Sequence, residues 1–260
     1  MLMILLISID HKHMISNMKR YSLLLLLILF SGNLFAQRDY LTEKTFPAYS
    51  EYLSNKFGIV CNIPQKFANL NKYNVGWKVR KDKDKYTGNM YGLTLISGNK
   101  ECIVIYSAFP HHVSEEDTEM RKKKALLIYP RSQITFEIKT ALGLYYSYGH
   151  PLNNDSAKFD FSEYVTTVAG KKAREMFNAD SIYIYDIPGA DSVYFFDQSL
   201  EKMRRKKYPN CTSVFISKNN RASMDFKFFF TKKGKGKEEK YIAMLSKQIW
   251  YEDDFKDEEK

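Results

Sequence analysis

The sequence lacks the short linear motifs that mark the common enzyme classes. It contains no G-x-S-x-G, H-E-x-x-H, C-x-x-C, G-x-x-x-x-G-K-[ST] or G-x-G-x-x-G pattern. Those patterns carry the nucleophile of many hydrolases, the zinc site of metalloproteases, thiol redox chemistry and the binding of nucleotide phosphates. Their absence removes the support for these classes. The sequence therefore predicts no catalytic residues, no cofactor and no metal site.

Cysteine is scarce as well, and the three cysteines are an odd number. Cys61 shares a predicted strand face with Ile59 and Ile63, which indicates a buried and reduced thiol. Cys102 and Cys211 each follow a turn-prone segment and each begin a β-rich run. If any two cysteines pair, we expect the disulfide to join Cys102 and Cys211.

The chain has no apolar run long enough to cross a membrane. The longest one, residues 23–30, is well short of the roughly 20 residues that span the hydrocarbon core. Lys19 and Arg20 precede it, and a turn-prone stretch ending in a small residue, 33–36, follows. This is the order of regions in a signal peptide.

We expect translation to begin at Met18, so that residues 1–36 are an N-terminal extension followed by a signal peptide. Cleavage would fall between Ala36 and Gln37. Because residue 37 is not cysteine, the new N-terminus has no thiol for a lipid anchor. The expected product is exported to the periplasm or secreted, without a membrane span after processing. An uncleaved membrane anchor is the alternative.

Positive charge is in excess, with a formal net charge of +10, and it is unevenly placed. Lysine and arginine gather at residues 121–124, 204–207 and 232–237, whereas the tail 252–260 is mostly acidic. An exported protein rarely meets nucleic acid, so the charge favours an acidic glycan, a lipid head group or an envelope protein as partner. The alternative is that these clusters are only solvated faces and a frayed terminus.

The first half of the mature chain carries several strand and helix signals. Alternating apolar residues predict a strand over 57–63, ended by Pro64. Residues 91–97 and 102–109 are joined by Gly-Asn-Lys-Glu, which predicts a hairpin because glycine and asparagine accept positive φ. Helices are expected over 114–127 and 132–142.

In the second half, the strongest helical pattern covers residues 160–178. There Val165, Val168 and other apolar residues recur at three- and four-residue spacing. Further strands are expected at 181–187, 193–196, 212–216 and 222–231, followed by a closing helix over 238–250. Short turns join the early strands. The order therefore predicts one α+β domain over 37–260, with a mainly antiparallel sheet packed against several amphipathic helices and a short acidic C-terminal tail.

Two resemblances accompany this order of elements. The Leu-Phe-Ala-Gln ending of the signal segment resembles the signal peptides of exported envelope proteins of Bacteroidetes. The early strand ending at Pro64, the hairpin and the last amphipathic helix loosely resemble PsbP-like α+β domains. That resemblance implies binding and assembly factors as well as proteins of unknown role, and a fold alone does not identify a function.

Three segments are candidates for contacts. His111 and His112 stand before three acidic residues, a set that suits a divalent metal, although a polar loop leading into a helix explains it equally. The tyrosine-rich segment with Tyr145, Tyr146, Tyr148 and His150 is the favoured partner-contact region, with half-buried core tyrosines as the alternative. The segment 232–237 is basic and glycine-spaced, so phosphate would fit it, but a mobile loop is the default.

Two functional classes remain. The favoured one is an exported, non-enzymatic binding or accessory protein of the envelope. The alternative is a periplasmic hydrolase that uses paired carboxylates, because aspartate and glutamate can act as acid and base without a linear signature. A deep pocket with two facing carboxylates would favour the hydrolase.

Overall fold

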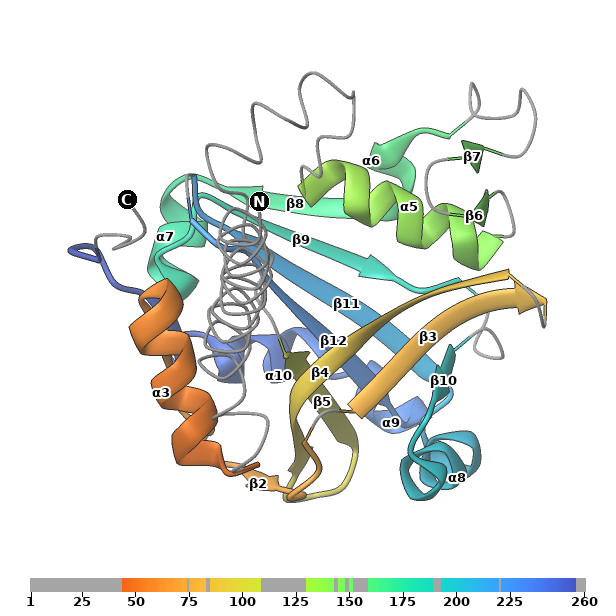
Figure 1. The fold of residues 1–260 in the computed structure, drawn as a ribbon, viewed down its shortest axis with the longest axis horizontal. Coiled ribbons are helices and arrows are strands. Elements are labelled where there is room, and N and C mark those ends of the chain that lie inside the picture. Colours follow the sequence, from red (N-terminus) through yellow and green to blue (C-terminus); the bar gives the residue numbers. More distant parts are fainter. Residues whose placement is uncertain are drawn as a thin grey trace, which may run out of the picture. The chain divides into compact units, whose positions relative to one another are not determined.

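The fold is built around a twisted antiparallel sheet (Figure 1). The computed structural model describes residues 44–73, 75–82, 85–108, 130–142, 145–147, 150–151, 159–188, 193–219 and 221–255. From Lys44 onward the chain clusters as one unit. The expected signal segment, the helix at 114–127 and the end of the acidic tail lie outside the described residues.

Eight strands lie side by side in the main path of the sheet, and each neighbouring pair is antiparallel. In spatial order they are β10 (Val193–Phe195), β3 (Val75–Asp82), β4 (Lys85–Ser97), β5 (Cys102–Ser107), β12 (Met224–Phe230), β11 (Asn210–Ser217), β9 (Ser181–Asp186) and β8 (Val165–Ala169). A short strand, β2 (Phe67–Asn69), pairs with the C-terminal end of β4. The predicted α+β class is confirmed.

One face of the sheet is covered by helix α5 (Pro130–Leu142), which lies across the strands in Figure 1. Ile134 and Ile138 of this helix are fully buried against Ile105 and Phe229 of the sheet. Burying such side chains stabilises the fold by about 1.5–3 kcal/mol each. The sequence predicted this helix, and its position is set by that apolar stripe.

The opposite face is covered by helix α3 (Phe46–Phe57), helix α10 (Glu238–Leu245) and a small sheet of β1 (Ile59–Cys61) and β13 (Ile249–Tyr251). The remaining helices are α6 (Phe161–Tyr164), α7 (Lys171–Phe177), α8 (Gln198–Lys207) and α9 (Lys232–Lys235). Strands β6 (Tyr145–Ser147) and β7 (His150–Pro151) form a separate pair. None of the helices in the described ranges is long and apolar enough to cross a membrane.

The predicted helix over 160–178 is wrong. The segment is divided into α6, edge strand β8 and α7, with Gly170 between the last two at φ 64°. Residues 165–168 are Val-Thr-Thr-Val, and four successive β-branched side chains restrict χ1 in a helix but pack well on a sheet. Pairing with β9 overrides the helical spacing of the apolar residues.

Two other predicted boundaries also change. Phe57 ends helix α3 rather than beginning a strand, because Gly58 takes the left-handed conformation that ends a helix. The closing helix stops at Leu245 instead of 250, and Ile249–Tyr251 is strand β13. The hairpin of β4 and β5 is confirmed, as are the strands predicted near 181–187 and 212–216.

The expected Cys102–Cys211 disulfide does not fit the structure, in which all three cysteines are free and buried. Cys102 lies beside Phe230, and Phe230 lies beside Asn210, so strand β12 separates the two cysteines. Two strand spacings are about 10 Å, beyond the roughly 7 Å limit between bridged Cα atoms. Cys211 is also one residue out of register with Cys102 across β12, so the two side chains point to opposite faces of the sheet.

Candidate functional site

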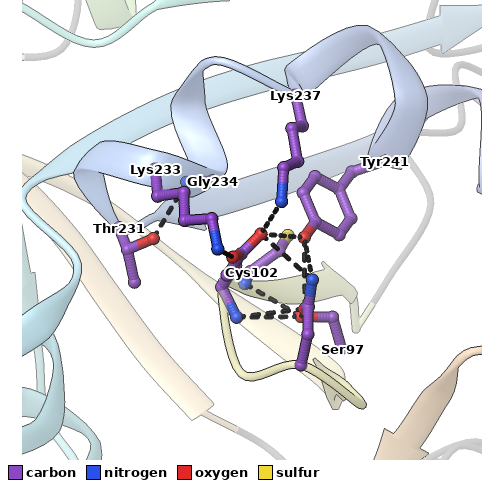
Figure 2. A network of polar contacts seen from close by, with 9 residues as sticks. Ser97, Cys102, Thr231, Lys233, Gly234, Lys237 and Tyr241 are labelled. Carbon is purple, nitrogen blue, oxygen red and sulfur yellow. Dashed lines mark hydrogen bonds and ion pairs between the residues drawn. The ribbon is translucent and has the colours of Figure 1, made fainter.

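A polar network surrounds Glu101, at the end of the turn between β4 and β5. Figure 2 shows Lys233, Lys237 and Tyr241 reaching from the α9–α10 segment toward this turn. The ammonium of Lys237 donates to Oε2 of Glu101 at 2.7 Å, and that of Lys233 lies 3.2 Å from Oε1. The Tyr241 hydroxyl and the Asn99 amide each donate to Oε2 at 3.0 Å. Four side chains therefore hold one carboxylate.

This arrangement fixes the protonation state of Glu101. The ammonium of Lys237, together with Lys233 and Tyr241, lowers the pKa of Glu101 to about 2. A general base works best when its pKa lies near the operating pH. Glu101 is therefore ionised near neutral pH, and its lowered pKa suits a structural ion pair better than a general base.

The same turn is held through the main chain of the α9 segment. The Thr231 N–H donates to the Glu101 carbonyl at 3.0 Å, and the Gly234 N–H donates to the Thr231 hydroxyl at 2.9 Å. A Cβ atom at position 234 would meet the Glu101 carbonyl oxygen at 2.3 Å. Glycine is required there because only a residue without a side chain permits this approach.

The charges of the basic segment 232–237 are largely compensated within the protein. Lys233 and Lys237 bind Glu101. Lys235 binds Asp186 and Glu238, the latter at 2.6 Å. The hypothesis that this loop cradles a phosphate loses its support, because three of its ammonium groups already have carboxylate partners.

A pocket of about 470 Å³ adjoins the Glu101 network, between β2, the β4–β5 turn and α10. It is lined by Gln65, Lys66, Phe67, Ala68, Ser97, Gly98, Asn99, Lys237, Lys240, Tyr241 and Met244. We call it the Lys66–Lys240 pocket. Main-chain pairing assembles it, since the Gly98 N–H donates to the Lys66 carbonyl at 2.8 Å.

The charged side chains that line this pocket in the described structure are all positive. Its described lining residues include three lysines and no carboxylate. Lys66 and Lys240 are exposed, and within the described ranges neither forms an ion pair with a carboxylate. Phe67 and Met244 give it apolar surface, and the Phe67 ring meets the Tyr241 ring edge to face at 6.2 Å. The pocket thus offers positive charge beside an apolar wall.

A second depression, of about 530 Å³, lies between the start of α3 and the segment after β2. Lys72 in its wall forms an ion pair with Asp197 at 2.8 Å. The Asn69 amide donates to the Tyr73 hydroxyl at 2.5 Å. Because these polar groups bind one another, this depression offers a ligand less than the Lys66–Lys240 pocket does.

A separate charged cluster is buried between α5 and the sheet. Lys227 is fully buried, with its ammonium 2.7 Å from Glu137 of α5 and 3.0 Å from Asp225 of its own strand. The Ser213 hydroxyl lies 2.7 Å from the same ammonium. Burial alone would lower the pKa of Lys227, but the two carboxylates raise it. The lysine is therefore held protonated between two acids.

Two tyrosines complete this buried cluster. Tyr185 donates to Glu137, and Tyr91 donates to Asp225 at 2.7 Å. Burial raises the pKa of Glu137. Neither carboxylate lines either of the two pockets described above. The cluster fixes α5 on the sheet, because moving the helix would leave the charges unpaired.

The structure does not describe the side chains of the residues predicted as partner contacts. Tyr145 and Tyr146 lie on β6 and His150 on β7. Tyr148, His111 and His112 lie outside the described residues, as do the side chains of the β6–β7 pair. Among the described residues, no cluster of three or more histidine, cysteine or acidic side chains could hold a metal ion.

Neither a protein-family model nor a curated protein matches this chain. Its function therefore has to rest on the chemistry of its own side chains. Sequence reasoning missed Lys66, Glu101 and Lys240, which are far apart along the chain and carry no local motif. The basic, glycine-spaced segment 232–237 was the one usable signal, since Lys237 lines the pocket.

Proposed function

We propose that this protein is exported and acts as a non-enzymatic binding protein of the envelope, with an acidic ligand in the Lys66–Lys240 pocket. The observation that carries the proposal is that the described lining of that pocket includes no carboxylate and has two lysines, Lys66 and Lys240, without an ion pair among the described residues, while its third lysine, Lys237, is bound to Glu101. Uncompensated ammonium groups attract anions and raise their local concentration. The size also suits a small ligand, because such pockets measure about 300–1,000 Å³.

Binding is favoured over catalysis because Glu101, the carboxylate beside the pocket, is already bound by Lys233 and Lys237. Glu101 is held ionised by Lys237 and Lys233, with its pKa lowered to about 2. With so low a pKa it is a weak base, poorly matched to take a proton from a substrate near neutral pH. The pocket has cations to hold an anion, but the described residues supply it with no acid–base pair.

The alternative was a hydrolase with paired carboxylates, and Glu137 and Asp225 are the pair to consider. Both bind the same Lys227 ammonium, at 2.7 and 3.0 Å, and both are buried. A hydrolase needs room for substrate and water between its two acids. An ammonium occupies that position here, so we do not favour this function.

The ligand class that best suits the pocket is an acidic glycan. A sugar acid presents a carboxylate to the lysines and a C–H face to apolar surface such as Phe67 and Met244. An anionic lipid head group shares the charge but brings acyl chains. An acidic segment of an envelope protein is the third source of the same chemistry.

Titration of the purified mature protein with labelled oligogalacturonate tests this proposal. A neutral oligosaccharide of equal length is the first control, and vesicles with an anionic lipid form a second arm. In the double variant Lys66→Ala, Lys240→Ala we expect affinity for the acidic glycan to fall about tenfold, since each lost exposed charge contact is worth roughly 0.7 kcal/mol. Two exposed lysines of α8 provide the matched control, as Lys202→Ala, Lys206→Ala.

Equal affinity for the neutral and acidic sugars would contradict the proposal, as would an equal loss in both double variants. Export is tested separately by N-terminal sequencing of the secreted or periplasmic fraction. We expect the chain to begin at Gln37. A membrane-bound product that retains residues 23–30 would overturn the proposed localisation.

A further inference from the structure

Strand β8 is the last strand at one end of the described sheet (Figure 1). It pairs with β9 on one side, in continuous register from Val165–Tyr185 to Ala169–Ser181. Thr166, Thr167 and Ala169 are exposed. An edge strand of this kind presents main-chain N–H and C=O groups that a further strand can bind.

The hydrogen-bond pattern identifies which groups face outward. The Gly170 N–H donates to the Asp180 carbonyl, across the pair that continues the β8–β9 register. Antiparallel strands alternate between bonded and non-bonded pairs, so the outward groups belong to residues 165, 167 and 169. The Val165 N–H is already used by the Phe161 carbonyl at the end of α6. Thr167 therefore lies at the centre of the open edge.

The side chains of β8 lack the usual protection of an edge strand. Its sequence, Val-Thr-Thr-Val-Ala, contains no charge and no proline, and it has no bulge. Proteins commonly place charges, proline or bulges on edges to prevent pairing with other chains. The charges lie instead just beyond its two ends, with exposed Glu163 before the strand and exposed Lys171 after it.

We propose that β8 pairs antiparallel with β8 of a second copy of this chain, with Thr167 at the two-fold axis. In this register the Thr167 N–H and C=O of each copy bind those of the partner's Thr167. The Ala169 N–H donates to the carbonyl of the partner's Val165. The two sheets become one continuous sheet across the dimer, and the closed symmetry ends the edge on both copies.

Charge complementarity favours a second copy over another occupant. About this axis, the end of β8 that follows Glu163 of α6 meets the end of the partner's β8 that precedes Lys171 of α7, so these opposite charges come to the same end of the paired strands, and this occurs twice. Lys171 has an ion pair within its own chain, to Glu175 at 3.7 Å, but its side chain remains 90% exposed. A parallel arrangement would instead place like charges together at each end.

Next to these charges, an aromatic side chain and a glycine of the two copies also fit together. Tyr164, 38% exposed, is the last residue of α6 and precedes Val165, which pairs with the partner's Ala169 in the proposed register, so its ring comes close to the partner's Gly170. Nothing lies within 4 Å of the position of a Cβ atom at Gly170. An aromatic ring over an edge glycine covers main chain that is otherwise exposed, a known means of stabilising strand pairs.

Sedimentation equilibrium of the mature protein tests the proposal. We expect a monomer–dimer equilibrium with a Kd on the order of 10–100 µM, because the interface is smaller than a standard one. Glu163→Lys and Lys171→Glu should each weaken the dimer about fivefold, by opposing like charges. The double variant should restore the native Kd to within about twofold, as expected of two directly paired charges.

Thr167→Pro supplies a second test that does not depend on charge. It removes an N–H that faces away from β9, so we expect the dimer to be lost while the melting temperature is largely kept. Thr167→Val keeps the N–H and should keep the dimer. A native protein that stays monomeric to about 1 mM overturns the proposal. A dimer that neither Thr167→Pro nor the single charge reversals weaken also overturns it, because another surface would then form it.

Discussion

Gly234 lies directly against the main-chain carbonyl of Glu101, and a Cβ atom at position 234 would come within 2.3 Å of that oxygen. The contact joins the α9 segment to the β4–β5 turn. Both partners of this contact are main-chain groups, so displacing either one would cost free energy. The position of Lys237 beside the pocket depends on this contact.

The first prediction concerns that glycine. Gly234→Ala should destabilise the protein by about 1–3 kcal/mol, the usual range for forcing an atom into packed space. Gly236→Ala is the matched control, since its nearest neighbour would lie 3.7 Å away and its φ is −65°. Chemical denaturation of both variants measures the difference. Equal stability of the two would show that the turn can relax.

The second prediction concerns pH and Glu101. A carboxylate whose pKa is lowered by folding stabilises the native state above its unfolded pKa, 4.5, and this is lost as the pH falls through about 2. We therefore expect Glu101→Gln to lower the melting temperature by a constant amount from pH 7 to pH 5. The gap should shrink from pH 4.5 downward and close near pH 2. A gap that is unchanged at pH 2 would mean that charge plays no part.

The third prediction concerns the buried cluster under α5. Lys227→Met should cost about 3–5 kcal/mol, because it leaves Glu137 and Asp225 buried without their cation. Adding Glu137→Leu should recover part of the loss by removing one of those charges. The exposed control Lys202→Met should stay within about 0.5 kcal/mol of the native protein. Urea unfolding of the three variants gives the values, and a Lys227→Met protein as stable as the control would contradict this account.

The fourth prediction separates two valines of the segment whose helix prediction was wrong. Val165 is 5% exposed and belongs to the core under α5, whereas Val168 is only partly buried. Val165→Asp should lower the melting temperature strongly, because a carboxylate there loses its hydration. Val168→Asp should have a small effect. A continuous helix would bury both positions alike, so similar losses in a circular dichroism melt would favour the helix after all.

The comparison of sequence and structure shows where local patterns suffice. The hairpin of β4 and β5 was predictable because a turn-prone segment joins two β-rich runs, although the positive φ falls on Lys100 rather than on Gly98 or Asn99. Helix α5 was predictable from its boundaries, Ser132 near its start and Gly143 after its end. Helix α3 was missed, although Thr45 as its N-cap, Pro47 in its first turn and Gly58 as its C-cap are all visible in the sequence.

Other features could not be read from local patterns. In the segment 160–178 the apolar residues have helical spacing, and the pairing with β9, which local spacing does not reveal, overrides it. The pocket is harder still to predict. Lys66 and Lys240 line the same pocket because β2 pairs with β4 and α10 packs beside that pair.

The most direct test of the proposed function is an NMR titration of the isotope-labelled mature protein with oligogalacturonate. We predict that the amide shifts of the pocket segments at 65–68, 97–99 and 237–244 move together and saturate with one Kd. The Lys66→Ala, Lys240→Ala protein should keep the native spectrum except next to the two substitutions, and its pocket shifts should need about tenfold more ligand to reach half-saturation. If the shifts stay unchanged, or change elsewhere with the pocket silent, the Lys66–Lys240 pocket is not the binding site.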